Sequence, residues 1–261
     1  MSGKWNLPPQ PLPSWLSPGL ETTEGHRDMT PGDFTAECVC ELLDCGVSIT
    51  QAIEVTANTL NETGHGRYYR ANNLGGWKIT PGIPGKWWRA PGNRAPGATW
   101  AGHEGATVTN LKGGDPPWCY YRAFASFAQY FAQWLKLFVP KPGTVGEKHR
   151  YRKTGVAFWF EDSAVFSTWF RELCLAGYKG ARTKKNPEGS IAEHRQLVAM
   201  ARTRFAQKKL GVVPDGVWGP KSKAKCEEFQ RLNGLQVNGE ITQEVLEKLA
   251  EHWLATHGEA L

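Results

Sequence analysis

Long apolar runs are missing from this sequence of 261 residues. No stretch approaches the ~20 apolar residues that a membrane-spanning helix needs, so we expect no membrane insertion. Residues 1–5 are followed by prolines and lack the apolar segment of a secretion signal. We therefore expect a protein that is made in the cytoplasm without a signal peptide. If it works elsewhere, another system must release or deliver it.

Cysteine is also scarce, with six residues in the chain. That number is too small for a fold that depends on a dense disulfide framework. Cys38, Cys40 and Cys45 are not spaced as in a zinc site, and no pair of histidines follows them at a suitable distance. No His-Glu-x-x-His motif occurs either. We expect buried free thiols, and neither a metal site nor a cofactor.

A block of basic residues of the kind found in nucleic-acid-binding arms is absent as well. Lys184 and Lys185 form a pair and not a stripe. We therefore expect no nucleic acid as a partner. The net charge of +6 nevertheless favours a polyanionic partner, and a membrane surface or a bacterial wall would fit.

Tryptophan, glycine and proline are abundant, with 12, 29 and 17 residues. The glycines and prolines indicate much loop. Exposed tryptophan faces often hold sugar rings, although most tryptophans lie in cores. The composition is therefore compatible with a carbohydrate ligand and does not require one.

The spacing of apolar residues predicts a mainly α protein. Helical periods run through residues 34–43, 49–60, 120–138 and 163–176, whereas residues 72–118 carry the glycines, prolines and short Thr and Val runs of strands and loops. Ser48 with Gln51, and Ser190 with Glu193, form capping boxes that begin helices. We expect a proline-rich arm at 1–33, a larger domain at 34–182, a linker with the start of a helix at 183–193, and a small helical module at 194–261.

The C-terminal module carries two similar turns. Asp215-Gly216 and Asn238-Gly239 are each placed to form a tight turn, and Ser222 and Thr242 are placed to cap the helices that follow. Together with Leu210-Gly211, Trp218-Gly219, Phe229-Gln230 and Leu246, these residues resemble the peptidoglycan-binding type 1 family over residues 194–254. The resemblance implies a three-helix module that binds peptidoglycan. It leaves open whether the turn residues contact sugar or only fold the module.

Residues 34–182 contain four short motifs. The first is Glu62-Thr63-Gly64-His65-Gly66 at a helix end, and the second is Asn72-Asn73-Leu74-Gly75-Gly76-Trp77-Lys78. The others are Tyr121-Arg122-Ala123-Phe124 and Ala176-Gly177-Tyr178. Together they resemble the glucosaminidase domain of bacterial cell-wall hydrolases, which is similar to flagellar muramidases, although Tyr178 is not followed by the Asp and Pro of the family. The resemblance implies that residues 34–182 are a catalytic domain with a lysozyme-like α+β fold, which has a helical lobe and a small β-lobe.

Cleavage of a glycosidic bond requires a carboxylic acid that is still protonated when it meets the leaving oxygen. The resemblance assigns this role to Glu62. The negative end of a helix dipole disfavours a carboxylate by about 0.3–1 kcal/mol, which is too little alone. Desolvation by aromatic residues must add to it, and Tyr68, Tyr69, Trp77 and Trp88 are the nearest in sequence.

The second carboxylate is less determined. Glu104 lies about where the family places a glutamate, and Asp115 is the alternative. Tyr178 is expected to hold substrate or to stabilise positive charge at the anomeric carbon, unless it is a core tyrosine. Other residues of the motifs are expected to bind substrate: Gly66, Asn73, Trp77, Lys78 and Trp88.

These features predict a monomeric hydrolase of β-1,4 bonds in peptidoglycan, either an N-acetylglucosaminidase or a muramidase. A phage endolysin or an interbacterial toxin would act on the wall after release or delivery, and a toxin would have an immunity protein as its partner. A lytic transglycosylase is the alternative within catalysis. A non-catalytic wall-binding protein is the alternative outside it.

Overall fold

A computed structural model describes residues 29–66, 72–75, 87–89, 120–122, 124, 126–138, 170–171, 174–175 and 186–257. The described part is mainly helical, as the sequence predicts. None of its helices combines the length and apolar character needed to cross a membrane.

The chain divides into two compact units. One runs through Glu62–Tyr130, and the other combines Met29–Asn61 with Phe131–Leu261. The first unit holds the strands β1 (Trp87–Arg89) and β2 (Tyr120–Arg122), which pair antiparallel with Trp88 opposite Tyr121. A strand in 72–118 agrees with the sequence pattern there, whereas residues 120–122 were predicted to be helical. The complete β-lobe stays a prediction.

Helix α1 (Pro31–Asp44) begins three residues before the apolar period that predicted it. Its start is set by Thr30, whose side-chain oxygen accepts a hydrogen bond from the Asp33 amide at 3.1 Å. Pro31 then occupies the first turn, where its missing N–H costs nothing. The buried face of α1 includes Phe34, Val39 and Leu42.

Helix α2 (Ile49–Thr63) begins at the predicted capping box. The Ser48 amide donates to the Gln51 side chain at 3.0 Å, and the Gln51 amide donates back to Ser48 Oγ at 3.3 Å. Residues 51–60 are all buried, so α2 is an interior helix. Helix α3 (Phe127–Phe138) carries the aromatic period of its segment, with Phe131 and Trp134 buried.

Three helices form the C-terminal part of the second unit: α6 (Pro187–Lys209), α7 (Pro220–Leu232) and α8 (Gln243–His257). Asn186 caps α6, accepting from the Gly189 amide, so α6 begins before the predicted capping box at Ser190. Residues 187–193 are therefore helical and continuous with the module.

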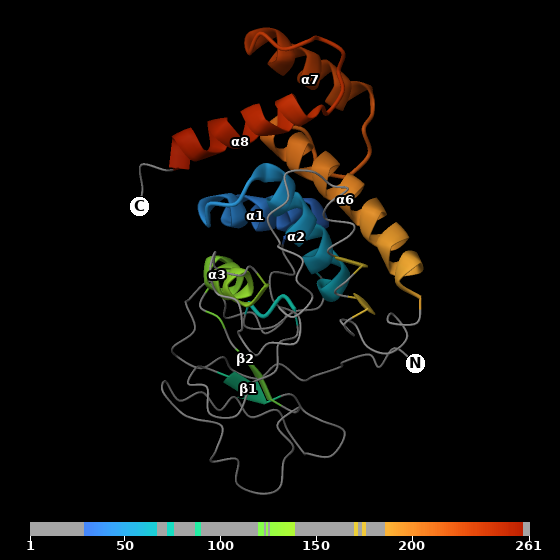
Figure 1. The fold of residues 1–261 in the computed structure, drawn as a ribbon. Helices are drawn as coiled ribbons and strands as arrows, with labels where there is room; N and C mark the ends of the chain where they lie inside the picture. Colours follow the sequence, from blue (N-terminus) through green and yellow to red (C-terminus); the bar gives the residue numbers. More distant parts are fainter. Residues whose placement is uncertain are drawn as a thin grey trace, which may run out of the picture. The chain divides into compact units, whose positions relative to one another are not determined.

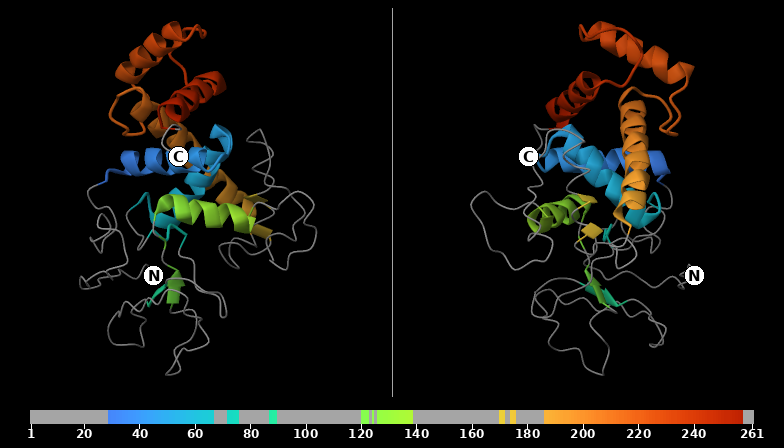
Figure 2. Two further views of the ribbon diagram at one scale, coloured as in Figure 1. Left: turned by 90° about the vertical axis from the view of Figure 1, so that its left-hand side faces the viewer. Right: turned by 45° about the vertical axis from the view of Figure 1, so that its right-hand side comes forward.

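Within the second unit, α6 and α8 pack against α1 (Figure 1). Figure 2 shows the same packing from two further sides. Lys208 Nζ binds Asp33 Oδ1 at 2.8 Å, and Trp253 Nε1 donates to Asp44 Oδ1 at 3.3 Å. Gly32 faces Pro214, so closely that a Cβ on Gly32 would lie 2.6 Å from Pro214 Cγ and would collide with the Pro214 carbonyl oxygen.

Five cysteines of the described part are free thiols, and Cys119 lies outside that part. Cys38, Cys40, Cys174 and Cys226 are buried, which confirms the expectation of buried free thiols for these four. Burial raises the pKa of the Cys40 thiol to about 11, although Lys209 acts in the opposite direction. Burial also raises the pKa of Cys226 to about 11. Such thiols stay protonated and unreactive at neutral pH.

Substitution Gly32→Ala should destabilise the second unit, because the new methyl group must displace Pro214. We expect a loss of about 1–3 kcal/mol in the free energy of unfolding. Gly189→Ala in α6 is the matched control, because its Cβ would meet only ordinary contacts, the nearest at 3.6 Å. Alanine should stabilise that helix by about 0.5–1 kcal/mol. Urea denaturation of both variants checks this, and equal midpoints would contradict the close packing.

Candidate functional site

The predicted acid, Glu62, lies on the last turn of α2 with an exposed side chain. Three consecutive residues after the helix have positive φ: Gly64 at 55°, His65 at 63° and Gly66 at 83°. The Gly66 amide donates to Thr63 Oγ1 at 2.9 Å, which fixes this turn against a buried side chain. His65 adopts a left-handed conformation that residues other than glycine rarely occupy, and such strain is often found at functional sites.

The second predicted motif begins with two buried asparagines. Asn72 has a φ of 53° and donates from Nδ2 to the Phe124 carbonyl at 3.0 Å. Asn73 and Leu74 are only 4% and 1% exposed. The contact joins the second motif to the third, since Phe124 belongs to the segment that resembles the family helix opening. Both lie in the unit that contains Glu62.

The structure places some of the other predicted site residues. Trp88 is the central residue of β1 and pairs with Tyr121 of β2. Several fall outside the described residues: Trp77, Lys78, Glu104, Asp115 and Tyr178. No cluster of metal-binding side chains occurs among the residues that the structure describes.

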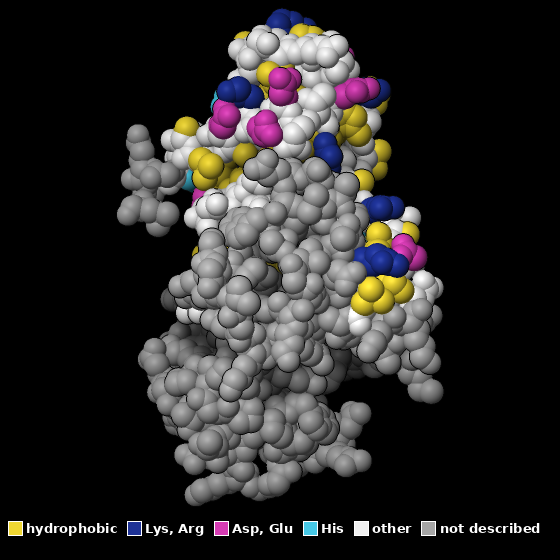
Figure 3. All heavy atoms as spheres, viewed as in Figure 1, with side chains coloured by type: hydrophobic (Ala, Val, Ile, Leu, Met, Phe, Trp, Pro, Cys, Tyr) yellow, Lys and Arg dark blue, Asp and Glu magenta, His cyan; other side chains and the backbone are white. Residues whose placement is uncertain are grey.

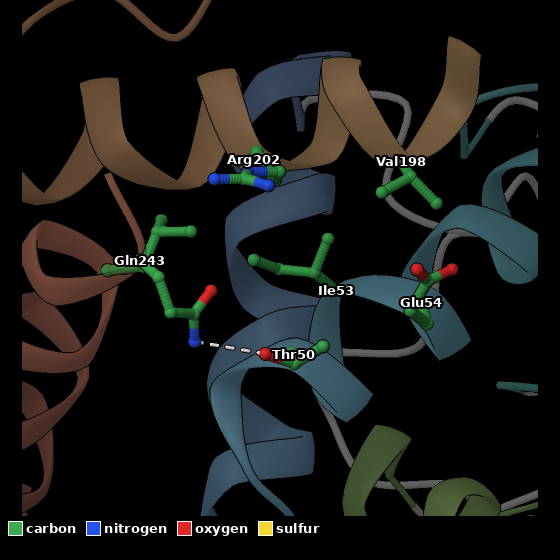
Figure 4. A pocket seen from close by; sticks show the side chains of 7 residues that line it. Thr50, Ile53, Glu54, Val198, Arg202 and Gln243 are labelled. Atoms are coloured by element: carbon green, nitrogen blue, oxygen red, sulfur yellow. Dashed lines mark hydrogen bonds between the residues drawn. The ribbon is translucent and has the colours of Figure 1, made fainter. Parts of the chain in front are cut away.

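A pocket lies between α2, α6 and α8 in the second unit, and Figure 4 shows its lining, with Gln243 bound to Thr50. Its cavity volume is about 10 Å³, which is room for about one water molecule and not for a sugar ring. Glu54 on its wall binds His194 Nε2 at 2.9 Å, and both side chains are almost fully buried. The pocket is therefore a junction between helices and not a sugar site.

The first turn of the module is held by Gln207, a side chain that is 1% exposed. Its Nε2 donates to Asp215 Oδ1 at 2.8 Å and to the Val217 carbonyl at 2.9 Å, and it also reaches Ser222 Oγ at 3.2 Å. Its Oε1 accepts from the Gly216 amide at 2.9 Å. Ser222 therefore lies within α7 and contacts Gln207. The prediction that Ser222 caps this helix was wrong, since Gly219 is the cap residue.

The second turn repeats the arrangement with Gln230, whose side chain is fully buried. Its Nε2 donates to Asn238 Oδ1 at 2.8 Å and to the Glu240 carbonyl at 3.2 Å. Its Oε1 accepts from the amides of Asn238 and Gly239 at 3.0 and 2.9 Å. Thr242 then caps α8 as predicted, accepting from the Val245 amide at 3.2 Å.

The two turns are related by a shift of 23 residues, which superposes Gln207 on Gln230 and Asp215 on Asn238. The shift also matches Gly211 with Gly234, which have φ values of 70° and 65°. Gly216 and Gly239 both have the positive φ that the sequence predicted, 88° and 68°. Sequence reasoning missed Gln207, although a glutamine eight residues before each Asx-Gly pair was visible as part of an internal repeat.

Comparison with protein families matches residues 194–249 to the family described as "Putative peptidoglycan binding domain". The match supports the predicted C-terminal binding module and peptidoglycan as a partner. It covers α7, most of α6 and the first half of α8, together with both glutamine-held turns. Neither the curated proteins nor the solved structures yield a match.

The two turns should differ in their response to acid. Hydrogen bonds from the Val217 amide and from Gln207 lower the pKa of the Asp215 carboxyl below its ordinary 3.8. A group whose pKa is lower in the folded state stabilises the fold above its unfolded pKa, and this contribution disappears as pH falls through the folded pKa. Asp215→Asn should therefore flatten the fall in stability below about pH 4.

Asn238→Asp provides the reciprocal variant, because the oxygen at that position already accepts from Gln230 and from the Glu240 amide. It should add acid sensitivity that the wild-type turn does not have. Thermal unfolding of the three proteins at neutral pH and near pH 3 measures the difference. If both substitutions left the acid-dependent loss unchanged, the hydrogen bonds would not act on the carboxylate as described.

Proposed function

We propose that this protein hydrolyses β-1,4 glycosidic bonds of peptidoglycan, as an N-acetylglucosaminidase or a muramidase, with Glu62 as the general acid. The match of residues 194–249 to a peptidoglycan-binding family is the observation that carries the proposal. A module that binds the wall is expected to accompany a domain that acts on it. The proposed fold of that domain is lysozyme-like, with a β-lobe beside the helical lobe.

The position of Glu62 supports its role. Its side chain is exposed at the end of a buried helix, so a polymeric substrate can reach it while the backbone stays fixed. Gly64 and Gly66 in the adjoining turn have no Cβ atoms, which allows a glycan strand to approach the backbone closely at these two residues. The bound sugar and the tryptophans of the motifs would then exclude water from the carboxyl and favour its protonated form.

The reaction requires that the bond between the anomeric carbon and the bridging oxygen breaks, with its electron pair moving to that oxygen. Glu62 supplies the proton that the oxygen takes up. Glu104, or Asp115 in its place, would remove a proton from the attacking water or stabilise the positive charge at the anomeric carbon. The 2-acetamido group of the sugar can fill the nucleophilic role instead. Tyr178 would contribute at the same carbon.

The remaining motif residues are proposed to hold the glycan. Trp77 and Trp88 offer aromatic faces on which sugar rings stack. Lys78 offers a hydrogen-bond donor and a positive charge, and Gly66 offers close access to the backbone. Asn73 is buried, so its contribution would be to support the loop that the substrate meets.

Two cellular settings and two alternative functions belong with this proposal. A phage endolysin or an interbacterial toxin would act on the wall after release or delivery, and a toxin would need an immunity protein in the producing cell. A lytic transglycosylase would use the same acid but would close an anhydro ring instead of adding water. A wall-binding protein without activity is the alternative that the family match by itself also fits.

Substitution Glu62→Gln should abolish the loss of turbidity that the wild-type protein causes in a suspension of purified walls. Removing a general acid typically costs 10²–10⁴-fold in rate, so we expect at least a ~100-fold loss. Glu193→Gln is the matched control, because Glu193 is exposed on α6. Both variants should still sediment with walls. Equal activity of Glu62→Gln and wild type would overturn the assignment, and a wild-type protein that binds walls without clearing them would leave the non-catalytic alternative.

Mass spectrometry of the released muropeptides identifies the bond. Reduced GlcNAc ends are expected of an N-acetylglucosaminidase, reduced MurNAc ends of a muramidase, and anhydro-MurNAc ends of a lytic transglycosylase. The last result would contradict the proposed hydrolysis.

The variants Glu104→Gln and Asp115→Asn separate the two candidates for the second carboxylate. We expect the glutamate variant to lose ~10²-fold or more in activity and the aspartate variant to keep most of it. Azide added to the impaired variant tests the role further, because a small anion can replace a missing carboxylate. Full activity of Glu104→Gln with an inactive Asp115→Asn would exchange the two assignments.

A further inference from the structure

The guanidinium of Arg204 lies against the first turn of the module. A Cβ built on Gly216 would be 3.3 Å from Arg204 Nε and 3.7 Å from its Cγ. The Nε and Nη1 atoms are buried, and neither has a hydrogen-bond partner among the described residues. Nη2 is then the nitrogen that remains at the surface. A partly buried cation whose donors are unused is costly unless a ligand compensates it.

The Asp215 carboxylate does not neutralise Arg204 through a hydrogen bond. Asp215 is close enough to act on the guanidinium by its charge. Its Oδ1 instead accepts from Gln207 and from the Val217 amide, which are the bonds that form the turn. The turn therefore directs this carboxylate toward the backbone and leaves the cation available.

The internal repeat indicates that the turn does not depend on the positive charge of Arg204 for its structure. At the equivalent place in the second turn, 23 residues later, stands Glu227. Its side chain packs on Gly239 as Arg204 packs on Gly216, since a Cβ built on Gly239 would be 3.1 Å from Glu227 Oε1 and 3.3 Å from its Cγ. Two turns that share most of their hydrogen bonds thus accept opposite charges at this position. A basic residue at 204 is not required to build the turn.

Apolar side chains flank the same turn. Val213 and Val217 are each 69% exposed, which is unusual for valine in a small helical module. On the face drawn in Figure 3, apolar, basic and acidic side chains lie side by side over the described helices. The first turn therefore combines exposed methyl groups with a cation whose Nε and Nη1 atoms make no hydrogen bond among the described residues.

We propose that Arg204, Val213 and Val217 form a subsite for a carboxylate of the peptidoglycan stem peptide. The proposal rests on the wall-binding part of the proposed function and deepens it by naming the part of the polymer that is recognised. A guanidinium forms strong, charge-assisted hydrogen bonds with carboxylates. Stem peptides carry free carboxylates beside alanine methyl groups, which would pack on the two valines. The uncharged sugar rings offer no such anion.

Sedimentation of the full chain with purified sacculi, measured at 4 °C to limit digestion, tests the subsite. Arg204→Gln should bind about tenfold more weakly, the effect of losing one charge-assisted hydrogen bond. Arg204→Lys should retain part of the affinity, because it keeps the charge and loses the planar donor group. Two matched controls should bind as wild type: Arg195→Gln, at an exposed position of the same helix, and Glu227→Gln, at the equivalent place of the second turn. Unchanged binding by Arg204→Gln would overturn the proposal.

Competition on the wild-type protein gives a second readout that needs no variant. The soluble tetrapeptide L-Ala-γ-D-Glu-meso-diaminopimelyl-D-Ala should displace the protein from sacculi, and the same peptide with its carboxylates amidated should not. Equal competition by the two peptides would contradict a carboxylate subsite. Hydrofluoric acid removes phosphate polymers from sacculi and should leave binding unchanged. Loss of binding after that treatment would assign the anion to phosphate.

Glycan strands freed of stem peptides by an amidase separate the peptide from the lactyl carboxylate of MurNAc. They should bind about as weakly as Arg204→Gln binds intact sacculi, and full binding would overturn the proposal. A wild-type protein that fails to sediment with any sacculi would overturn wall binding itself. Peptide-sensitive binding without wall clearance would support the subsite and contradict only the proposed hydrolysis.

Discussion

The buried pair of Glu54 and His194 is the contact on which the second unit depends. It joins α2 to α6 across 2.9 Å, and the His194 ring stacks on Phe170 with ring centroids 4.4 Å apart. Two groups this deep must compensate each other, since loss of either would leave a polar or charged group without its main partner. The pair therefore fixes the register of α6 on α2. Such polar contacts are more specific than apolar ones, because a one-turn slip would separate them.

Helix α6 connects this buried pair to the two glutamine-held turns of the module. Its first half carries His194, and its last turns carry Arg204 and Gln207. Lys208 near its end binds Asp33 of α1, so the helix is held at both ends. Residues 187–189, which were expected to belong to a linker before a helix at Ser190, form the start of α6. Within the second unit, the module is therefore held against α1 and α2 by contacts along α6.

The sequence predicted the features that depend on local chemistry. The Ser48 capping box, the glycine turns after α2 and the two Asx-Gly turns all follow from the conformations that a few neighbouring residues permit. The contacts between distant segments were not predictable in the same way. No periodic pattern in the sequence indicates the contact of Gly32 with Pro214 or that of Glu54 with His194, because both contacts depend on how distant segments pack. Tyr120–Arg122 was misassigned because its aromatic residues fit a helical period as well as a strand, and pairing with β1 decided between them.

The internal repeat shows how folding and recognition can be separated within one small module. Gln207 and Gln230 perform the same task, and their surroundings match down to the sign of φ at four glycines. Residues that build the turns are therefore the ones that agree between the two halves. Arg204 and Glu227 differ although the backbone around them agrees. Such residues are not needed to build the turns and can bind a ligand. Because the two turns belong to one chain and share a fold, the difference in charge between them makes the first turn the side of the module that we propose for an anionic ligand.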